Sequence, residues 1–239
     1  MAETENTTAS AVSRRQALGW MALSGAALAA TGLGADDLHA APYVPASERI
    51  KTPAQALAEL AAGNRRFVDG RATNPNRSMA RIREVAPSQA PFAAFLSCAD
   101  SRVPVELLFD QGFGDLFVCR TAGNIVSPDN LASLEFGTAV LGAKALVVLG
   151  HSECGAVKAA MPGAAVPGQI SSLYQFIRPG INDAPAGDVP AATRANVMHQ
   201  VEVLTNSSPV IGTLIKEGKL AVRGAVYDLG TGRVTMFNA

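Results

Sequence analysis

The sequence predicts an α/β fold with a mostly parallel central β-sheet flanked by helices. Short apolar runs alternate with segments of helical periodicity from residue 92 onward, which is the pattern of strand–helix–strand units. The run at residues 145–150, Ala-Leu-Val-Val-Leu-Gly, is almost purely apolar, as in strands covered on both faces. Polar, chemically active residues directly follow two of these runs, and ligands gather at the carboxyl ends of strands in such sheets.

The first predicted element of the domain is a helix. Thr52 is suited to the N-cap and Pro53 to the first helical position. Apolar residues then recur at helical spacing as far as Phe67, and Gly70 closes the segment. The polar stretch at residues 71–88 predicts a loop and a short helix.

The later elements alternate between strands and helices. Apolar runs predict the parallel strands, at residues 92–97, 116–120 and 145–150. Helical spacing predicts further helices, at residues 130–141, 191–206 and 208–217. Prolines predict a loop-rich segment at residues 159–187, and a hairpin is expected to close the chain at residues 220–237.

The composition bounds the class of protein. The 239 residues are 48% hydrophobic, enough for one large domain with a full core. Lys plus Arg equal Asp plus Glu, at 20 each, and no basic run carries interleaved aromatic residues. We therefore expect no nucleic-acid partner, and an anionic membrane surface is disfavoured as well.

Residues 1–40 have the features of an export signal. Arg14 and Arg15 precede a stretch at residues 16–35 that contains no charged residue and is mostly Ala and Gly. We expect a twin-arginine (Tat) signal peptide, recognised by the Tat translocase, with cleavage after residue 35 or 40. The domain would then be residues 41–239, in the periplasm. An uncleaved anchor of about 20 residues and a disordered cytoplasmic tail are the alternatives.

Two cysteines and one histidine form a candidate metal site. Cys98 directly follows the first predicted strand, and His151 and Cys154 follow the third. Thiolates and imidazole are typical zinc ligands, and three protein ligands leave a fourth position for chemistry. The sequence therefore predicts one catalytic Zn²⁺ per subunit; the alternative is a Cys98–Cys154 disulfide in a metal-free exported chain. Cys119 lies in an apolar run and is expected to be a buried strand thiol.

Asp100 and Arg102 flank the first ligand. A surface ion pair would contribute only about 0–1 kcal/mol and would be incidental. The interpretation that we favour is that Asp100 accepts a hydrogen bond from the zinc-bound water and orients it, while Arg102 holds Asp100 as a bidentate partner. A closed state with Asp100 as the fourth zinc ligand is the alternative. Because two thiolates cancel the charge of Zn²⁺, we also expect activity to rise at alkaline pH.

These residues stand in two strings that together resemble the β-class carbonic anhydrases. The strings are Cys-Ala-Asp-Ser-Arg-Val-Pro at residues 98–104 and Gly-His-Ser-Glu-Cys-Gly at residues 150–155, and the likeness covers residues 52–237. The resemblance implies a lyase that hydrates CO2 reversibly to bicarbonate and a proton by a zinc-bound hydroxide. It also implies that Cys98, His151 and Cys154 are the zinc ligands and that Asp100 and Arg102 are catalytic.

The resemblance further implies a substrate pocket at a subunit interface. Gln89 matches a family glutamine that hydrogen-bonds the substrate from the partner subunit's side of the cleft. Phe117, Ala122 and Phe136 match the apolar lining where CO2 lies, and apolar walls suit a substrate with no strong hydrogen-bonding group. The family works as a dimer or a dimer of dimers, so we expect a homodimer or homotetramer.

Some members of the family bind bicarbonate at a noncatalytic site made of a Trp, an Arg and a Tyr. Here Phe95 stands at the Trp position, Arg120 at the Arg position and Phe136 at the Tyr position. Because two of the three residues are absent, we expect no such regulation and a water-bound rather than closed resting site.

Two other functions remain open on the sequence. A CS2 or COS hydrolase of the same family would use the same zinc site with a different access route. A noncatalytic zinc-binding or bicarbonate-binding protein is a second alternative, against which the intact Asp100–Arg102 pair and Gln89 argue.

Overall fold

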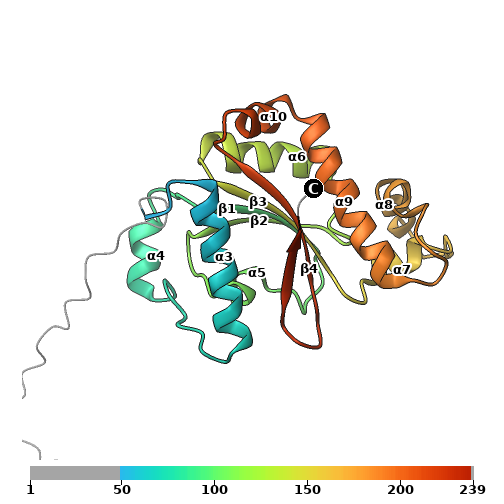
Figure 1. Cartoon of the computed structure of the whole chain (residues 1–239), viewed down its shortest axis with the longest axis horizontal. Helices are drawn as coiled ribbons and strands as arrows, with labels where there is room; N and C mark the ends of the chain where they lie inside the picture. Colours follow the sequence, from blue (N-terminus) through green and yellow to red (C-terminus); the bar gives the residue numbers. More distant parts are fainter. Residues whose placement is uncertain (1–48, 238–239) are drawn as a thin grey trace, which may run out of the picture. The chain divides into compact units, whose positions relative to one another are not determined.

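The computed structural model describes residues 49–237, and they form one central sheet with helices on its two faces (Figure 1). The strand order is β2-β1-β3-β4-β5, in which the first four strands are parallel and β5 is antiparallel to β4. The strands are β1 (Ala93–Ser97), β2 (Leu116–Arg120), β3 (Ala145–His151), β4 (Ala221–Tyr227) and β5 (Val234–Phe237). The predicted α/β fold with a mostly parallel sheet and a closing hairpin is confirmed.

Among residues 49–237, eight α-helices and two short irregular helices precede the first strand or lie between the strands. The α-helices are α3 (Pro53–Val68), α4 (Met79–Val85), α5 (Val105–Leu108), α6 (Pro128–Glu135), α7 (Gly155–Ala160), α8 (Tyr174–Ile181), α9 (Val189–Ser207) and α10 (Pro209–Lys216). A π-helical turn, η1 (Phe136–Val140), continues α6, and a 3-10 turn, η2 (Ile170–Leu173), precedes α8. No helix among residues 49–237 is long and apolar enough to cross a membrane.

Helix α3 begins and ends where its local sequence predicts. The Thr52 hydroxyl accepts from the backbone N–H of Gln55 at 3.2 Å, and the Gln55 side chain accepts from the backbone N–H of Thr52 at 3.1 Å. This capping box satisfies donors that a helix start leaves without partners. Gly70 follows the helix with φ +66°, a conformation that glycine adopts without steric cost.

The alternation of side chains along the strands divides the core into two layers. Phe95, Val147 and Leu149 pack in the layer that α3 covers, whereas Leu96 and Val148 pack in the layer that α9 and α10 cover (Figure 1). Every residue of β1 and β3 is buried, as strands covered on both faces require. The two central strands are therefore rigid supports for whatever follows their carboxyl ends.

The prediction of a loop-rich segment at residues 159–187 is wrong for its middle part. Helix α8 forms there with Pro179 inside it, because Tyr174, Ile177 and Ile181 recur at helical spacing and are buried. Proline removes one backbone donor in the last turn of this helix, and the burial of the apolar side chains outweighs that loss. The predicted helix at residues 130–141 instead starts at Pro128 and becomes π-helical after residue 135.

The predicted export signal, its cleavage site and the domain boundary at residue 41 lie outside the described residues.

Candidate metal centre

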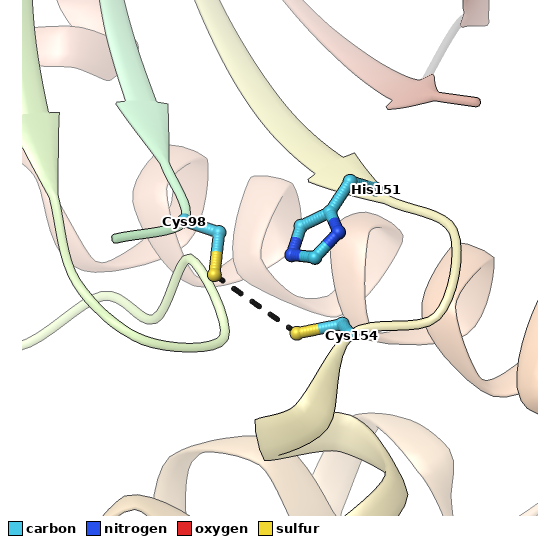
Figure 2. Close-up of side chains that lie close together, drawn as sticks. All are labelled: Cys98, His151 and Cys154. Atoms are coloured by element: carbon cyan, nitrogen blue, oxygen red, sulfur yellow. Dashed lines mark hydrogen bonds between the residues drawn. The ribbon is translucent and has the colours of Figure 1, made fainter. Parts of the chain in front are cut away.

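The two sequence strings meet because their strands are neighbours in the sheet. Strands β1 and β3 pair in parallel with Ser97 opposite Leu149, so Cys98 and His151 leave the same edge of the sheet side by side. Figure 2 shows the imidazole and the two sulfur atoms turned toward one another from β1, β3 and the start of α7. The ligand atoms of Cys98, His151 and Cys154 all lie within 4.8 Å of one another, and all three residues are buried.

The turn after His151 brings Cys154 back to the same point. The backbone N–H of Ser152 donates to the carbonyl of Tyr227 at 2.8 Å, and the Ser152 hydroxyl accepts from the backbone N–H of Leu229 at 2.9 Å. Glu153 takes a left-handed conformation, with φ +60°, and reverses the chain. The C-terminal end of β4 thus holds the turn that places Cys154 at the start of α7.

The hydrogen bonding of His151 leaves one ring nitrogen for a metal. Nδ1 lies 2.9 Å from the carbonyl oxygen of Ser152, which can only accept, so Nδ1 carries the proton. The buried Nε2 has no hydrogen-bond partner among the described residues. An unpaired, buried nitrogen lone pair that faces two sulfur atoms fits a metal ligand.

The spacing of the sulfur atoms fits zinc. The Sγ atoms of Cys98 and Cys154 are 4.0 Å apart, and both cysteines are free thiols. Tetrahedral zinc with Zn–S bonds of about 2.3 Å places two sulfurs about 3.8 Å apart. The donor set and its spacing therefore match a zinc site, and the alternative disulfide is not formed in the structure.

Each of the two thiols changes the pKa of the other. The hydrogen bond with Cys154, opposed by burial and assisted by His151, lowers the pKa of Cys98 to about 4. Contact with Cys98, together with burial, raises the pKa of Cys154 above its ordinary value. Two thiolates at this distance repel each other, so a divalent cation is needed before both can be ionised.

A strong ion pair joins Asp100 and Arg102. Nε of Arg102 donates to Oδ1 of Asp100 at 3.0 Å, Nη2 donates to Oδ2 at 2.8 Å, and the backbone N–H of Arg102 donates to Oδ1 at 2.9 Å. These bonds, opposed by partial burial, hold the pKa of Asp100 well below its usual range. Oδ2 lies 3.7 Å from Nε2 of His151, so the ionised carboxylate stands beside the ligand cluster.

Arg120 supports the loop that carries Cys98 and Asp100. Its Nε donates to the carbonyl of Cys98 at 3.0 Å, and its Nη2 donates to the carbonyl of Asp100 at 2.5 Å. Sequence reasoning assigned Arg120 only to the noncatalytic bicarbonate position. Arg120 is the last residue of β2, and no local sequence pattern marks it as a residue that supports the site. Phe95, at the corresponding Trp position, is fully buried against Phe109 with ring centroids 5.0 Å apart.

The predicted substrate-contacting residues lie less close together than the ligands. Phe117 on β2 is half-buried, with its ring centroid 6.4 Å from that of Phe136, which is 46% exposed. Ala122 is half-buried in the loop after β2. Gln89 is exposed between α4 and β1 and makes no hydrogen bond within residues 49–237. One chain thus assembles the metal ligands and the Asp100–Arg102 pair, but not Gln89.

Comparisons with known proteins point to one family. A family model described as carbonic anhydrase matches residues 93–234. Carbonic anhydrase 2 of Mycobacterium tuberculosis is 37% identical over 192 residues, which cover 77% of this chain and 92% of that protein. The β-carbonic anhydrase of Coccomyxa, solved with acetazolamide, is 32% identical with a TM-score of 0.58 over 75% of this chain and 85% of its own. The tetrameric β-carbonic anhydrases of Sordaria macrospora give 27% identity and a TM-score of 0.60 over 74% of this chain and 94% of theirs.

Proposed function

This chain belongs to the β-class carbonic anhydrase family, and we infer from that membership and from its site that it catalyses the zinc-dependent, reversible hydration of CO2 to bicarbonate and a proton. The observation that carries this conclusion is the buried Cys98–His151–Cys154 cluster with an ionised Asp100 beside it. A structural zinc site would have a fourth protein ligand, whereas this cluster offers three and a neighbouring carboxylate held by Arg102.

The residues of the chain divide the chemistry between them. Cys98, His151 and Cys154 would hold zinc, which would supply a Lewis acid that lowers the pKa of water. The Ser152 carbonyl fixes the His151 tautomer, so Nε2 always faces the cluster. Asp100 stays ionised, because Arg102 lowers its pKa, and therefore accepts a hydrogen bond from the attacking water and orients it toward CO2.

Arg102 also determines whether the Asp100 carboxylate can coordinate the metal. Both carboxylate oxygens of Asp100 receive a hydrogen bond from the Arg102 side chain. A carboxylate held in this bidentate way must lose that partner before it can turn and coordinate a metal. The ion pair therefore supports the water-bound, open form of the site over the closed form.

The substrate pocket is proposed to need a second copy of the chain. Phe117, Ala122 and Phe136 would give CO2 an apolar wall, and Gln89 of a partner would hydrogen-bond the substrate. The exposure of Gln89 and Phe136 in the single chain supports this assignment, because both are free to meet a second subunit. Members of the family are oligomeric, and we propose a homodimer or a homotetramer here.

We further propose export by the Tat translocase to the periplasm, directed by Arg14 and Arg15. The zinc site supports this route, because Tat carries folded proteins and bound zinc would protect the thiolates from oxidation. Replacing both arginines by lysine should leave the chain in the cytoplasm of a Tat-competent bacterium, as fractionation would show. Export of that variant at the normal level would reject the proposal.

Stopped-flow CO2 hydration with measured zinc content tests the activity. We expect one Zn²⁺ per chain and a rate that rises from pH 7 to pH 9, with no comparable hydrolysis of CS2 or COS. Zinc-loaded protein that hydrolysed CS2 or COS but did not hydrate CO2 would identify the hydrolase alternative. Loaded protein inactive on all three substrates would identify a noncatalytic binding protein.

A further inference from the structure

Gly123, beside the metal centre, is hydrogen-bonded through both of the peptide groups that flank it. The backbone N–H of Gly123 donates to Sγ of Cys98 at 3.4 Å, and the Gly123 carbonyl accepts from Nδ2 of Asn196 at 2.9 Å. Gly123 has φ +78°, and a Cβ there would come within 2.8 Å of Cδ1 of Ile177 and 3.3 Å of Cβ of Ala156. This glycine therefore allows both the conformation and the close packing that aim its N–H at the sulfur.

The amide of Asn196 is in turn held by Gln200, one turn later on α9. Oε1 of Gln200 accepts from the backbone N–H of Val126 at 2.8 Å, and its Nε2 lies 3.2 Å from Oδ1 of Asn196 and 2.8 Å from the carbonyl of Phe176. Asn196 is 0% exposed and Gln200 is 1% exposed. Buried amides are costly unless they are hydrogen-bonded, so this pair defines one arrangement of the loop at residues 121–126.

Helix α9 also packs against the strand that carries His151. A Cβ on Gly150 would lie 2.6 Å from Cγ2 of Val197, so helix and strand approach closely one residue before the ligand. The helix therefore supports the loop beside Cys98 with its polar residues and the end of β3 with an apolar residue. Within residues 49–237, no hydrogen bond joins Asn196 or Gln200 to a ligand atom, so we expect their effect on the site to pass through the loop.

We propose that Asn196 and Gln200 are positioning residues that set the zinc affinity of the site by holding the Gly123 N–H against the sulfur of Cys98. A backbone donor aimed at a ligand sulfur fixes where that sulfur lies, and supporting partners of this kind change metal affinity by about 10–100-fold. The proposal rests on the zinc site of the proposed function and adds a residue pair outside the ligand set.

Zinc affinity, measured by competition with a chelator, tests the proposal. Asn196→Asp keeps the shape and the acceptor for Gln200 but replaces the donor to the Gly123 carbonyl with a carboxylate oxygen. Asn196→Ala removes the same donor without adding charge. We expect both variants to bind zinc about 10–100-fold more weakly, and Gln200→Ala to bind about tenfold more weakly.

Leu204→Ala is the matched control on the same helix. Leu204 is fully buried in the core between α9 and the sheet, and its apolar side chain makes none of the hydrogen bonds that hold the loop at residues 121–126, so its truncation should lower the unfolding temperature and leave zinc affinity unchanged. Asn196 variants that lose stability as Leu204→Ala does, yet bind zinc as tightly as the parent chain, would overturn the proposal.

Hydrogen exchange on the unaltered protein gives a second test that needs no variant to fold. The Gly123 amide should exchange far more slowly than the amide of Gly187 in an exposed loop. Equal, fast exchange would overturn the proposal. A parent chain that binds zinc but does not hydrate CO2 would reject the proposed function alone, because neither measurement here depends on turnover.

Discussion

Two aspartate–arginine ion pairs of this chain have different roles, one at the metal centre and one in stabilising the fold. Asp100 pairs with Arg102, two residues away, at the metal centre. Asp110, whose side chain is fully buried, pairs at 2.6 Å with Arg66 of α3, which is distant in sequence. Asp110 also accepts from the backbone N–H groups of Thr73 at 3.0 Å and Asn74 at 2.8 Å. Within the described chain, the carboxylate of Asp100 receives hydrogen bonds only from Arg102.

The difference lies in what remains open around each carboxylate. The side chain of Asp110 is 0% exposed and its bonds join α3, the loop at residues 73–74 and the end of α5, so it ties three segments together. The side chain of Asp100 is 18% exposed and faces the ligand cluster at 3.7 Å from Nε2 of His151. We infer that Asp110 stabilises the fold, while Asp100 keeps accepting capacity for a reacting molecule.

Loss of the metal should lower activity more than any change at Asp100 or Asp110. Cys154→Ser should reduce zinc content from one ion per chain to a small fraction and lower kcat/KM by about 10³-fold or more, because the Lewis acid contributes several kcal/mol. Metal analysis and stopped-flow assay of the same sample check this. Cys119→Ser is the control, since this half-buried thiol on β2 is outside the cluster. Full activity of a zinc-free Cys154→Ser protein would contradict the assigned site.

Asp100→Asn should separate catalysis from metal binding. The amide keeps the size of the side chain but has one accepting oxygen in place of two, so we expect kcat/KM to fall about 100-fold. Zinc content and unfolding temperature should stay close to those of the parent chain. A loss of zinc equal to the loss of activity would instead make Asp100 a metal ligand.

Asp110→Asn should give the opposite result. Replacing the carboxylate leaves Arg66 and two backbone N–H groups without a charged acceptor, and we expect a loss of about 2 kcal/mol in the free energy of unfolding. The kcat/KM of the folded protein should not change. Urea unfolding followed by circular dichroism measures the first quantity; a catalytic defect with normal stability would reverse the assignment of the two aspartates.

The same aspartate predicts a pH dependence of stability. Burial raises the pKa of Asp110, but the bonds from Arg66, Thr73 and Asn74 outweigh it and lower the pKa to about 2. The carboxyl of an Asp in an unfolded chain has a pKa of about 3.9. The contribution of Asp110 to the free energy of unfolding is therefore complete above about pH 4 and is lost as the pH falls toward 2. Asp110→Asn should flatten the stability curve in this window, and an unchanged curve would argue against the ionised pair.

Arg102→Lys should have the smallest effect. Lysine keeps the positive charge but cannot form the two parallel bonds that hold Asp100, so we expect kcat/KM to fall about tenfold. Visible spectra of the cobalt-substituted protein test this most directly. An Asp100 that is no longer held by residue 102 and coordinates the metal would change the absorption bands. Parent-like kinetics and spectra would show that the bidentate geometry is not needed.

Local sequence predicted those parts of the fold in which one segment carries its own signal. The N-cap at Thr52 and the apolar strand at residues 145–150 are decided by neighbours within a few residues, and both predictions are confirmed. Helix α8 was missed because Pro179 suggested a loop, whereas burial of Tyr174 and Ile177 against other helices decides the outcome. Such burial depends on residues far away in the chain.

The candidate site follows the same rule. Cys98, His151 and Cys154 could be chosen from residue type, from the three-residue spacing of the second pair and from their positions after apolar strands. The support given by Arg120, Gly123 and Asn196 has no local pattern, because each contact joins residues from different elements.

By itself, the sequence determined which side chains are suited to hold a metal and that they stand at strand ends, since ligand type and strand periodicity depend on residue types and their spacing along the chain. Only the tertiary structure decided that β1 and β3 are neighbours, that Nε2 of His151 is the unpaired nitrogen, and that α9 holds the loop beside Cys98. Strand order, hydrogen-bond partners and burial arise when distant segments pack together. They set how the metal is held, while the residues themselves set which metal is suited.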